Sequence, residues 1–252
     1  MDVRIIALVL NLQILVMKFN FTALWFLCIA VLAFSGCSSS KTSNEKAKAK
    51  VMVLATLHGF HARNPNYTYE DVFKTVENFN PDVVAVEIRP EDLDKDTAYL
   101  KNIYPFEMRE LLQKLPETKK VGFDWYGEEA AGKMLTREMF MDSTTELGRV
   151  KALERALAQD TVMATKFAGL KNLQQQQFDL IKDATPAQVN DGRYDAVSAK
   201  YYEAVDSVLA GTKYEYRATF NRQRDKHIGD NIIEIIKQNP GKRIVFVTGA
   251  DH

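Results

Sequence analysis

Short apolar runs alternate with helical periods along most of the chain. Residues 51–57 and 83–86 are almost entirely apolar and short, which favours strands that are buried on both faces. Between them, residues 72–79 repeat apolar side chains at helical spacing, and Thr68 and Asp71 have the spacing of a capping box. The pattern predicts a strand, a helix and a second strand parallel to the first.

The same alternation continues to the end of the chain. A helix is expected at 106–115, a third strand at 120–124, a long helix at about 216–238 and a last strand at 242–248. The stretch between, about 128–211, is rich in helical signals and reads as an insertion. We therefore predict an α/β fold with a largely parallel sheet, flanking helices and a helical cap. The cap either only packs or acts as a lid that shapes a substrate pocket.

The beginning of the chain has the anatomy of a secretory signal. Lys18 precedes the apolar stretch 21–34, and Ser35-Gly36-Cys37 supplies small residues and a cysteine at the cleavage point. This arrangement resembles a bacterial lipoprotein signal, with Cys37 as the lipidated first residue of the mature chain. The alternative is a transmembrane anchor, because residues 5–36 contain enough apolar length to span a bilayer.

These signals divide the chain into a signal segment at 1–36, a lipidated tether at 37–50 and a single domain at 51–252. The tether is rich in Ser, Lys and Asn and has no apolar period, which is typical of a flexible linker. A second start at Met17 is an alternative that would remove residues 1–16. We expect a lipoprotein held at a membrane outside the cytoplasm, at the periplasmic face or the cell surface.

Charge and cysteine content exclude two classes of function. The chain has 33 basic and 33 acidic residues, so no long-range field favours nucleic acid as a partner. Of the two cysteines, Cys28 lies in the signal and Cys37 would carry lipid. The domain therefore has neither a disulfide nor a thiol nucleophile.

Polar side chains that can do chemistry follow the predicted strands. The run at 51–57 leads into His58, the run at 83–86 into Glu87, and the last strand leads to His252, while Asp124 ends the third strand. The carboxyl ends of parallel strands line one edge of a sheet, where ligands bind. We therefore expect these four side chains to converge.

Several motifs then carry a family resemblance. Ala55-Thr56-Leu57-His58, Val84-Ala85-Val86-Glu87-Ile88-Arg89 and Gly249-Ala250-Asp251-His252 resemble the superfamily that joins the erythromycin-esterase-like, haem-binding ChaN-like and TraB/GumN/TIKI proteins. Arg224-Asp225 with the later Asn231 resembles the esterase-like branch. The similarity spans nearly the whole mature chain and implies an α/β domain whose site contains the two histidines and the glutamate.

The chain also departs from that superfamily. TraB/TIKI-type members have Gly where this chain has Ala55, and their acidic-basic motif is one residue longer than the spacing of Glu87 and Arg89. Members also continue past the second histidine with another helix. A truncated gene product is therefore one interpretation of the ending at His252.

Two catalytic chemistries suit these residues. In the first, His58, Glu87 and His252, with Asp124 as a fourth ligand, hold a divalent ion such as zinc, manganese or cobalt that activates water. In the second, a histidine acts as general base, Glu87 orients it, and Arg89 or Arg224 stabilises an oxyanion. Either chemistry predicts a hydrolase of an ester or amide bond that acts on a small molecule or a peptide.

The alternative function is binding of haem or metal without catalysis. Resemblance to the ChaN-like branch permits a histidine or the nearby Tyr67 as a haem ligand. Structural roles compete with all of these assignments: His61 reads as a loop residue, and His227 as part of a solvated helix face. Arg89 and Arg224 can instead form ion pairs that hold the final helix to the sheet. Trp125 follows a strand and is expected to form a pocket wall.

Overall fold

The computed structural model of the chain describes residues 47–252. The predicted signal, the lipidation site Cys37 and most of the predicted tether lie outside the described residues. Within 47–252, no helix combines the length and apolar character needed to cross a bilayer. The elements, in chain order, are β1 (Lys50–Thr56), η1 (His58–Ala62), α2 (Tyr69–Phe79), β2 (Val83–Val86), η2 (Pro90–Asp92), α3 (Thr97–Ile103), α4 (Phe106–Gln113), β3 (Lys119–Gly122), η3 (Glu128–Ala130), α5 (Arg137–Met141), α6 (Glu146–Gln159), α7 (Thr161–Phe167), η4 (Ala168–Leu170), α8 (Lys171–Ile181), α9 (Pro186–Val189), α10 (Arg193–Leu209), α11 (Glu215–Gln238) and β4 (Arg243–Gly249).

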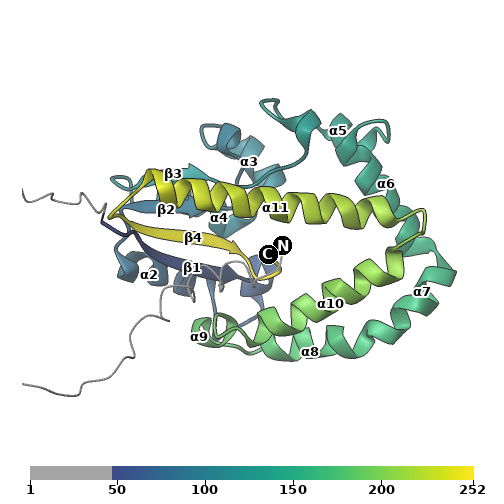
Figure 1. Cartoon of the computed structure of the whole chain (residues 1–252). Coiled ribbons are helices and arrows are strands. Elements are labelled where there is room, and N and C mark those ends of the chain that lie inside the picture. The colour runs from purple at the N-terminus through teal and green to yellow at the C-terminus, as the bar shows by residue number, and fades with distance from the viewer. Residues whose placement is uncertain (1–46) are drawn as a thin grey trace, which may run out of the picture. The chain divides into compact units, whose positions relative to one another are not determined.

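The strands form one parallel sheet in the order β1-β4-β2-β3 (Figure 1). This arrangement confirms the predicted α/β fold with a parallel sheet. The last strand in the sequence lies inside the sheet, where Thr56 at the end of β1 pairs with Gly249 and Val86 at the end of β2 pairs with Val247. The carboxyl ends of three strands therefore meet at β4.

The crossover from β1 to β2 follows the sequence signals. Thr68 caps α2 through the backbone N–H of Asp71, and the Asp71 side chain accepts a hydrogen bond from the backbone of Thr68 in return. The helix ends at Asn80, which has a left-handed backbone with a φ of 49°. Pro81 then begins the approach to β2, so the predicted capping box and stop are both present.

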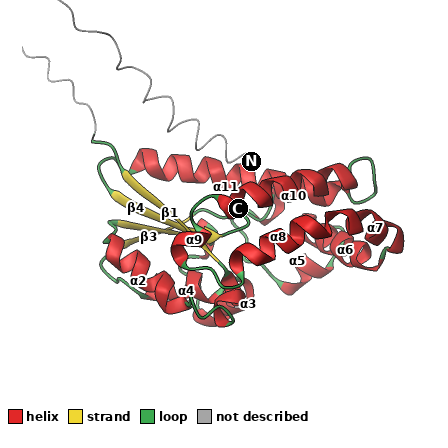
Figure 2. Ribbon diagram, turned by 90° about the horizontal axis from the view of Figure 1, so that it is seen from below, coloured by secondary structure: helices red, strands yellow, loops and turns green. Residues whose placement is uncertain are grey.

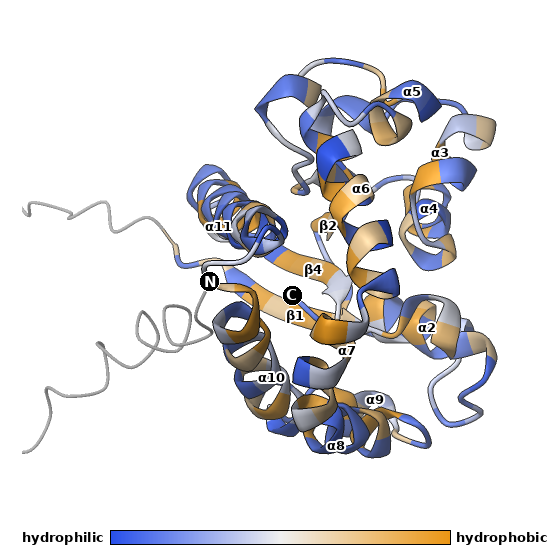
Figure 3. Cartoon of the chain, turned by 90° about the vertical axis from the view of Figure 1, so that its right-hand side faces the viewer, coloured by the Kyte–Doolittle hydropathy of each residue, from blue (hydrophilic) through white to orange (hydrophobic). Residues whose placement is uncertain are grey.

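Helices cover the two faces of the sheet. Val72 and Val76 of α2 and Met108 and Leu111 of α4 pack with Val84 on one face. On the other face, α11 packs against β2 and β4 and forms a second apolar cluster with Val83, Ala85, Ile228, Ile235, Ile244 and Phe246. Figure 2 shows α11 on one side of the strands and α2 and α4 on the other, and Figure 3 shows the apolar strands between them.

One burial prediction is wrong. Residues 51–57 were expected to be covered on both faces, but the side chains of Val51 and Val53 are 42% and 47% exposed. The reason is the strand order, because β1 is an edge strand and the apolar cluster under α11 is built from β2 and β4.

The predicted helical insertion contains α5 to α10 and lies beyond the carboxyl ends of the strands (Figure 1). It has a small core of its own, in which Met163 of α7 and Val205 and Leu209 of α10 pack against Tyr214 and Ala218 at the start of α11. The insertion is thus tied to the helix that also covers the sheet, and it stands over the edge where the candidate residues lie.

Candidate functional site

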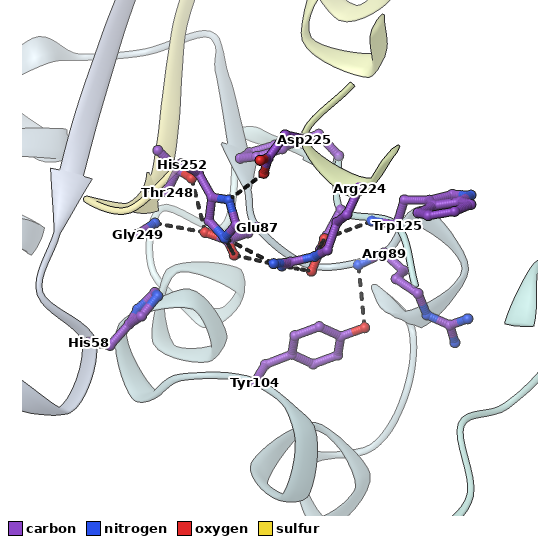
Figure 4. A network of polar contacts seen from close by, with 12 residues as sticks. His58, Glu87, Arg89, Tyr104, Trp125, Arg224, Asp225, Thr248, Gly249 and His252 are labelled. Carbon is purple, nitrogen blue, oxygen red and sulfur yellow. Dashed lines mark hydrogen bonds and ion pairs between the residues drawn. The ribbon is translucent and has the colours of Figure 1, made fainter. Parts of the chain in front are cut away.

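Glu87 lies at the carboxyl edge of the sheet, directly after β2. Its Oε2 accepts hydrogen bonds from the Thr248 hydroxyl at 2.9 Å and from the Gly249 backbone N–H at 2.7 Å, both at the end of the adjacent β4. Its Oε1 accepts from Nη2 of Arg224 at 2.9 Å (Figure 4). Burial alone would raise the pKa of Glu87, but the positive charges of His252 and Arg224 outweigh burial and hold that pKa well below its usual range.

Arg224 of α11 joins Glu87 to Asp124. Its Nε and Nη2 each lie 2.9 Å from an oxygen of the Asp124 carboxylate, and Nη2 also reaches Glu87. The guanidinium carbon lies over the Tyr126 ring, 5.3 Å from the ring centroid. Arg224 and the two carboxylates form one buried network. The N–H groups on Nε and Nη2 bind Asp124 and Glu87, and Nη1 faces His252.

His252 stands between carboxylates. Its Nδ1 lies 3.0 Å from Oδ1 of Asp225, and its Nε2 lies 3.3 Å from Oε1 of Glu87 and 2.9 Å from Nη1 of Arg224. Burial opposes protonation, but the charge of Glu87 and the hydrogen bond to Asp225 outweigh it and raise the pKa of His252 to about 10. At neutral pH the imidazolium therefore donates from Nδ1 to Asp225, forms an ion pair with Glu87 and adds a second positive charge beside Arg224.

His58 approaches the same place from β1. Its Nδ1 lies 2.7 Å from Oε1 of Glu107, a carboxylate that is fully buried on α4 and also accepts from the Thr56 hydroxyl at 3.0 Å. The His58 side chain is 38% exposed. Burial lowers its pKa, whereas the hydrogen bond to Glu107 and the charge of Glu87 raise it, and the net pKa lies above the ordinary value for histidine.

The position of the His58 ring depends on a glycine. A β-carbon at Gly249 would lie 2.4 Å from Nε2 of His58, so the ring packs directly on the backbone of β4. His58 itself has a positive φ of 48°, an unusual backbone for a residue other than glycine. With Nδ1 held by Glu107, the second ring nitrogen faces the end of β4 and the Glu87 network (Figure 4).

Glu107 was not among the predicted site residues. It follows no strand but lies in the first turn of α4, where Glu107, Met108 and Leu111 form the buried face of the helix. An acid on an otherwise apolar helical stripe is the signal that would have found it, because a buried carboxylate needs a partner. Here His58 is that partner.

Arg89 does not join this site. Its guanidinium is almost fully buried and donates to Asp92 and to the backbone carbonyls of Ala130 and Lys133, each at 2.8 Å. The buried Asp92 also accepts from Tyr104. Arg89 thus holds the beginning of the insertion to the loop after β2, and the structure separates it from Glu87, Arg224 and His252 (Figure 4).

Other sequence candidates have structural partners. His61 is buried, with Nε2 accepting from the Leu57 N–H at 2.8 Å and Nδ1 lying 2.7 Å from the Tyr67 carbonyl. The Tyr67 hydroxyl donates to the Ala55 carbonyl at 2.7 Å and the residue is buried, so it is not placed to ligate haem. The ring of His227 stacks on the ring of Trp125, with the centroids 4.2 Å apart. His227 is therefore not only part of a solvated helix face, and one face of the Trp125 ring is covered by His227 instead of lining a pocket.

The predicted metal ligands are close together but already engaged. Within residues 47–252, no group of three or more His, Cys, Asp or Glu side chains is arranged to hold a metal ion. Arg224 supplies the positive charge between Glu87 and Asp124, and both His252 nitrogens face other polar groups. These side chains do not fit a divalent ion as they are placed, and the metal site stays a prediction.

The structure therefore brings together His58, Glu87, Asp124, Arg224 and His252, and adds Glu107 and Asp225. Comparison of the chain with protein-family models, with curated proteins and with solved structures gave no match.

Proposed function

We propose that the protein is a hydrolase of an ester or amide bond that works with its own side chains. The observation that carries the proposal is the pairing of His58 with the buried Glu107 on one side of Glu87, opposite Arg224 and His252 on the other. A histidine whose Nδ1 is held by a carboxylate is oriented to accept a proton at Nε2. The opposite side carries positive charge that can stabilise an oxyanion.

In the first step, Nε2 of His58 takes a proton from water while the water oxygen attacks the carbonyl carbon of the substrate. The carbonyl π electrons move to oxygen, and Arg224 with the His252 imidazolium stabilises the resulting anion. On Arg224 this role falls to Nη1, which binds neither Asp124 nor Glu87 and lies 2.9 Å from Nε2 of His252.

In the second step, the tetrahedral intermediate collapses and the bond to the leaving group breaks. The His58 imidazolium returns its proton to the leaving alkoxide or amine, so the products are an acid and an alcohol or amine. Glu87 remains ionised throughout and holds Arg224, the Gly249 backbone and His252 in place. The motif resemblance to esterase-like proteins supports this reaction class.

The location of this activity is part of the proposal. The signal anatomy at residues 1–36 supports export and attachment of lipid at Cys37, which would place the hydrolase at a membrane surface outside the cytoplasm. Metabolic labelling with a fatty-acid analogue tests this point directly. We expect incorporation in the wild type and none in Cys37→Ser.

The experiment for the activity uses the purified full chain and p-nitrophenyl esters with acyl chains of increasing length. His58→Ala is expected to lower kcat by about 10²- to 10⁴-fold, the usual contribution of a general base. His227→Ala is the matched control, because it removes a histidine that stacks on Trp125 outside the network. Equal activity of the wild type and His58→Ala would contradict the proposal.

The same preparation separates the alternatives. Activity that a chelator removes and a divalent ion restores would favour the metal-dependent mechanism, whereas activity unchanged by the chelator is expected here. A Soret band in the visible spectrum of the purified protein, without hydrolysis, would favour the haem-binding alternative.

A further inference from the structure

A pocket of about 390 Å³ lies between α3, the loop after β3, and the α5–α6 part of the insertion. Its apolar wall consists of Ile103, Phe140, Met141 and the ring of Tyr126. The helices that contribute to it, α3, α5 and α6, are neighbours in Figure 3. The pocket therefore has space and apolar surface for a short hydrocarbon chain or a small ring.

The charged groups of this pocket are all positive. Lys151 and Arg155 stand one turn apart on α6 and both line it, and no carboxylate does. Lys151 pairs with Glu154 at 2.8 Å. The exposed side chain of Arg155 forms no ion pair or hydrogen bond with any residue in the part of the chain that the structure describes. An apolar wall beside an uncompensated guanidinium suits a ligand with an apolar body and an anionic end.

One aromatic ring connects this pocket to the candidate site. Tyr126 lines the pocket, and its ring also lies 5.3 Å from the guanidinium carbon of Arg224. The pKa of Tyr126 is raised by burial and by the nearby charge of Asp124, in keeping with its place beside the network. A molecule whose scissile bond lies at Arg224 therefore has this pocket within reach of its more distant atoms.

From this arrangement we infer that the pocket binds the anionic, apolar tail of the substrate, so that the preferred substrates are esters or amides of amphipathic carboxylates. The inference rests on the proposed hydrolase function. Arg155 is then a specificity-determining residue that binds the tail of the substrate, whereas His58 is the general base in cleavage of the ester or amide bond.

The kinetic test compares two esters that differ only at the far end of a six-carbon acyl chain. Mono-p-nitrophenyl adipate carries a carboxylate there, and p-nitrophenyl hexanoate carries a methyl group. The wild type is expected to prefer the adipate ester in kcat/KM by roughly three- to tenfold, the size of one hydrogen-bonded charge contact. Arg155→Gln is expected to remove this preference and leave the hexanoate ester unchanged.

Arg137→Gln is the matched control, because it removes an exposed arginine of α5 that does not line the pocket. It should keep the preference for adipate. Hydrolysis of both esters without preference, or an equal loss on both in Arg155→Gln, overturns the inference and leaves the hydrolase proposal standing.

If neither ester is hydrolysed, that result counts against the proposed function. A binding measurement then tests the pocket by itself. Calorimetric titration of the full chain with hexanoate and with hexanamide then decides. Tighter binding of hexanoate that is lost in Arg155→Gln and kept in His58→Ala supports the pocket assignment without turnover. Equal binding of the two probes, or binding of neither, overturns it.

Discussion

Nε2 of His58 packs against the backbone of Gly249, so closely that a β-carbon at position 249 would lie 2.4 Å from it. The contact joins the residue that begins the turn after β1 to the last residue of β4. Since Gly249 also donates its N–H to Glu87, one residue positions both sides of the site.

Gly249→Ala is therefore expected to displace the His58 ring and lower kcat by at least about tenfold, because small displacements of a catalytic group are costly. Gly169→Ala is the control, since a β-carbon there meets nothing within 4 Å. The measurement is kcat with circular dichroism on both variants. A fully active Gly249→Ala protein would show that the ring position is unimportant.

Replacing Glu107 changes the pH profile as well as the rate. The pKa of His58 lies above its ordinary value largely because of Glu107, so a general base at His58 loses activity as the pH falls through a value above about 6.5. Glu107→Gln should lower this pKa, move the acidic limb to lower pH and reduce the maximal rate by roughly 10²-fold. Profiles of kcat/KM against pH give the answer, and an unmoved acidic limb would argue against the pair.

His252 links stability to pH. Its folded pKa of about 10 lies above the value of about 6.5 in an unfolded chain, so its contribution is complete below pH 6.5 and is lost as the pH rises towards 10. We expect the Tm of the wild type to fall across this window more than that of His252→Gln. Parallel declines in the two proteins would mean that His252 is not held between Glu87 and Asp225.

Removing Arg224 leaves two carboxylates without the guanidinium that they share. Glu87 and Asp124 have side chains only 7% and 1% exposed, so Arg224→Ala is expected to destabilise the protein by about 3–5 kcal/mol. Arg222→Ala, on the same helix, removes a half-exposed ion pair with Asp206 and should cost about 0–1 kcal/mol. Urea unfolding measures both. In Arg224→Ala, Glu87→Gln should restore part of the stability, and a lack of any rescue would contradict the network.

The fold was predictable because each element carries a local signal, as the reciprocal caps of Thr68 and Asp71 illustrate. The order of strands carries no such signal. Nothing near Val51 or Val53 in the sequence reveals that β4 lies between β1 and β2, and this order is what exposes those two side chains.

The candidate site was also only partly predictable from the sequence. His58, Glu87 and His252 were found because they follow strands, whereas Glu107 reaches His58 from a helix that is distant in sequence. Arg89 was misassigned because the chain turns sharply after β2, where the Ile88 N–H donates to the Val86 carbonyl at 2.8 Å. This turn ends the alternation that would have placed Glu87 and Arg89 on the same side.

The place of β4 also affects how the protein folds. β1 and β2 do not touch each other in the sheet, and both pair with a strand that is synthesised only after the whole insertion and α11. Such distant pairing is slow, because closing the long intervening loop costs chain entropy before the strand contacts form. Gly249 reaches His58 and Glu87 only where β4 is paired in the sheet, so a chain with β4 unpaired has no assembled site.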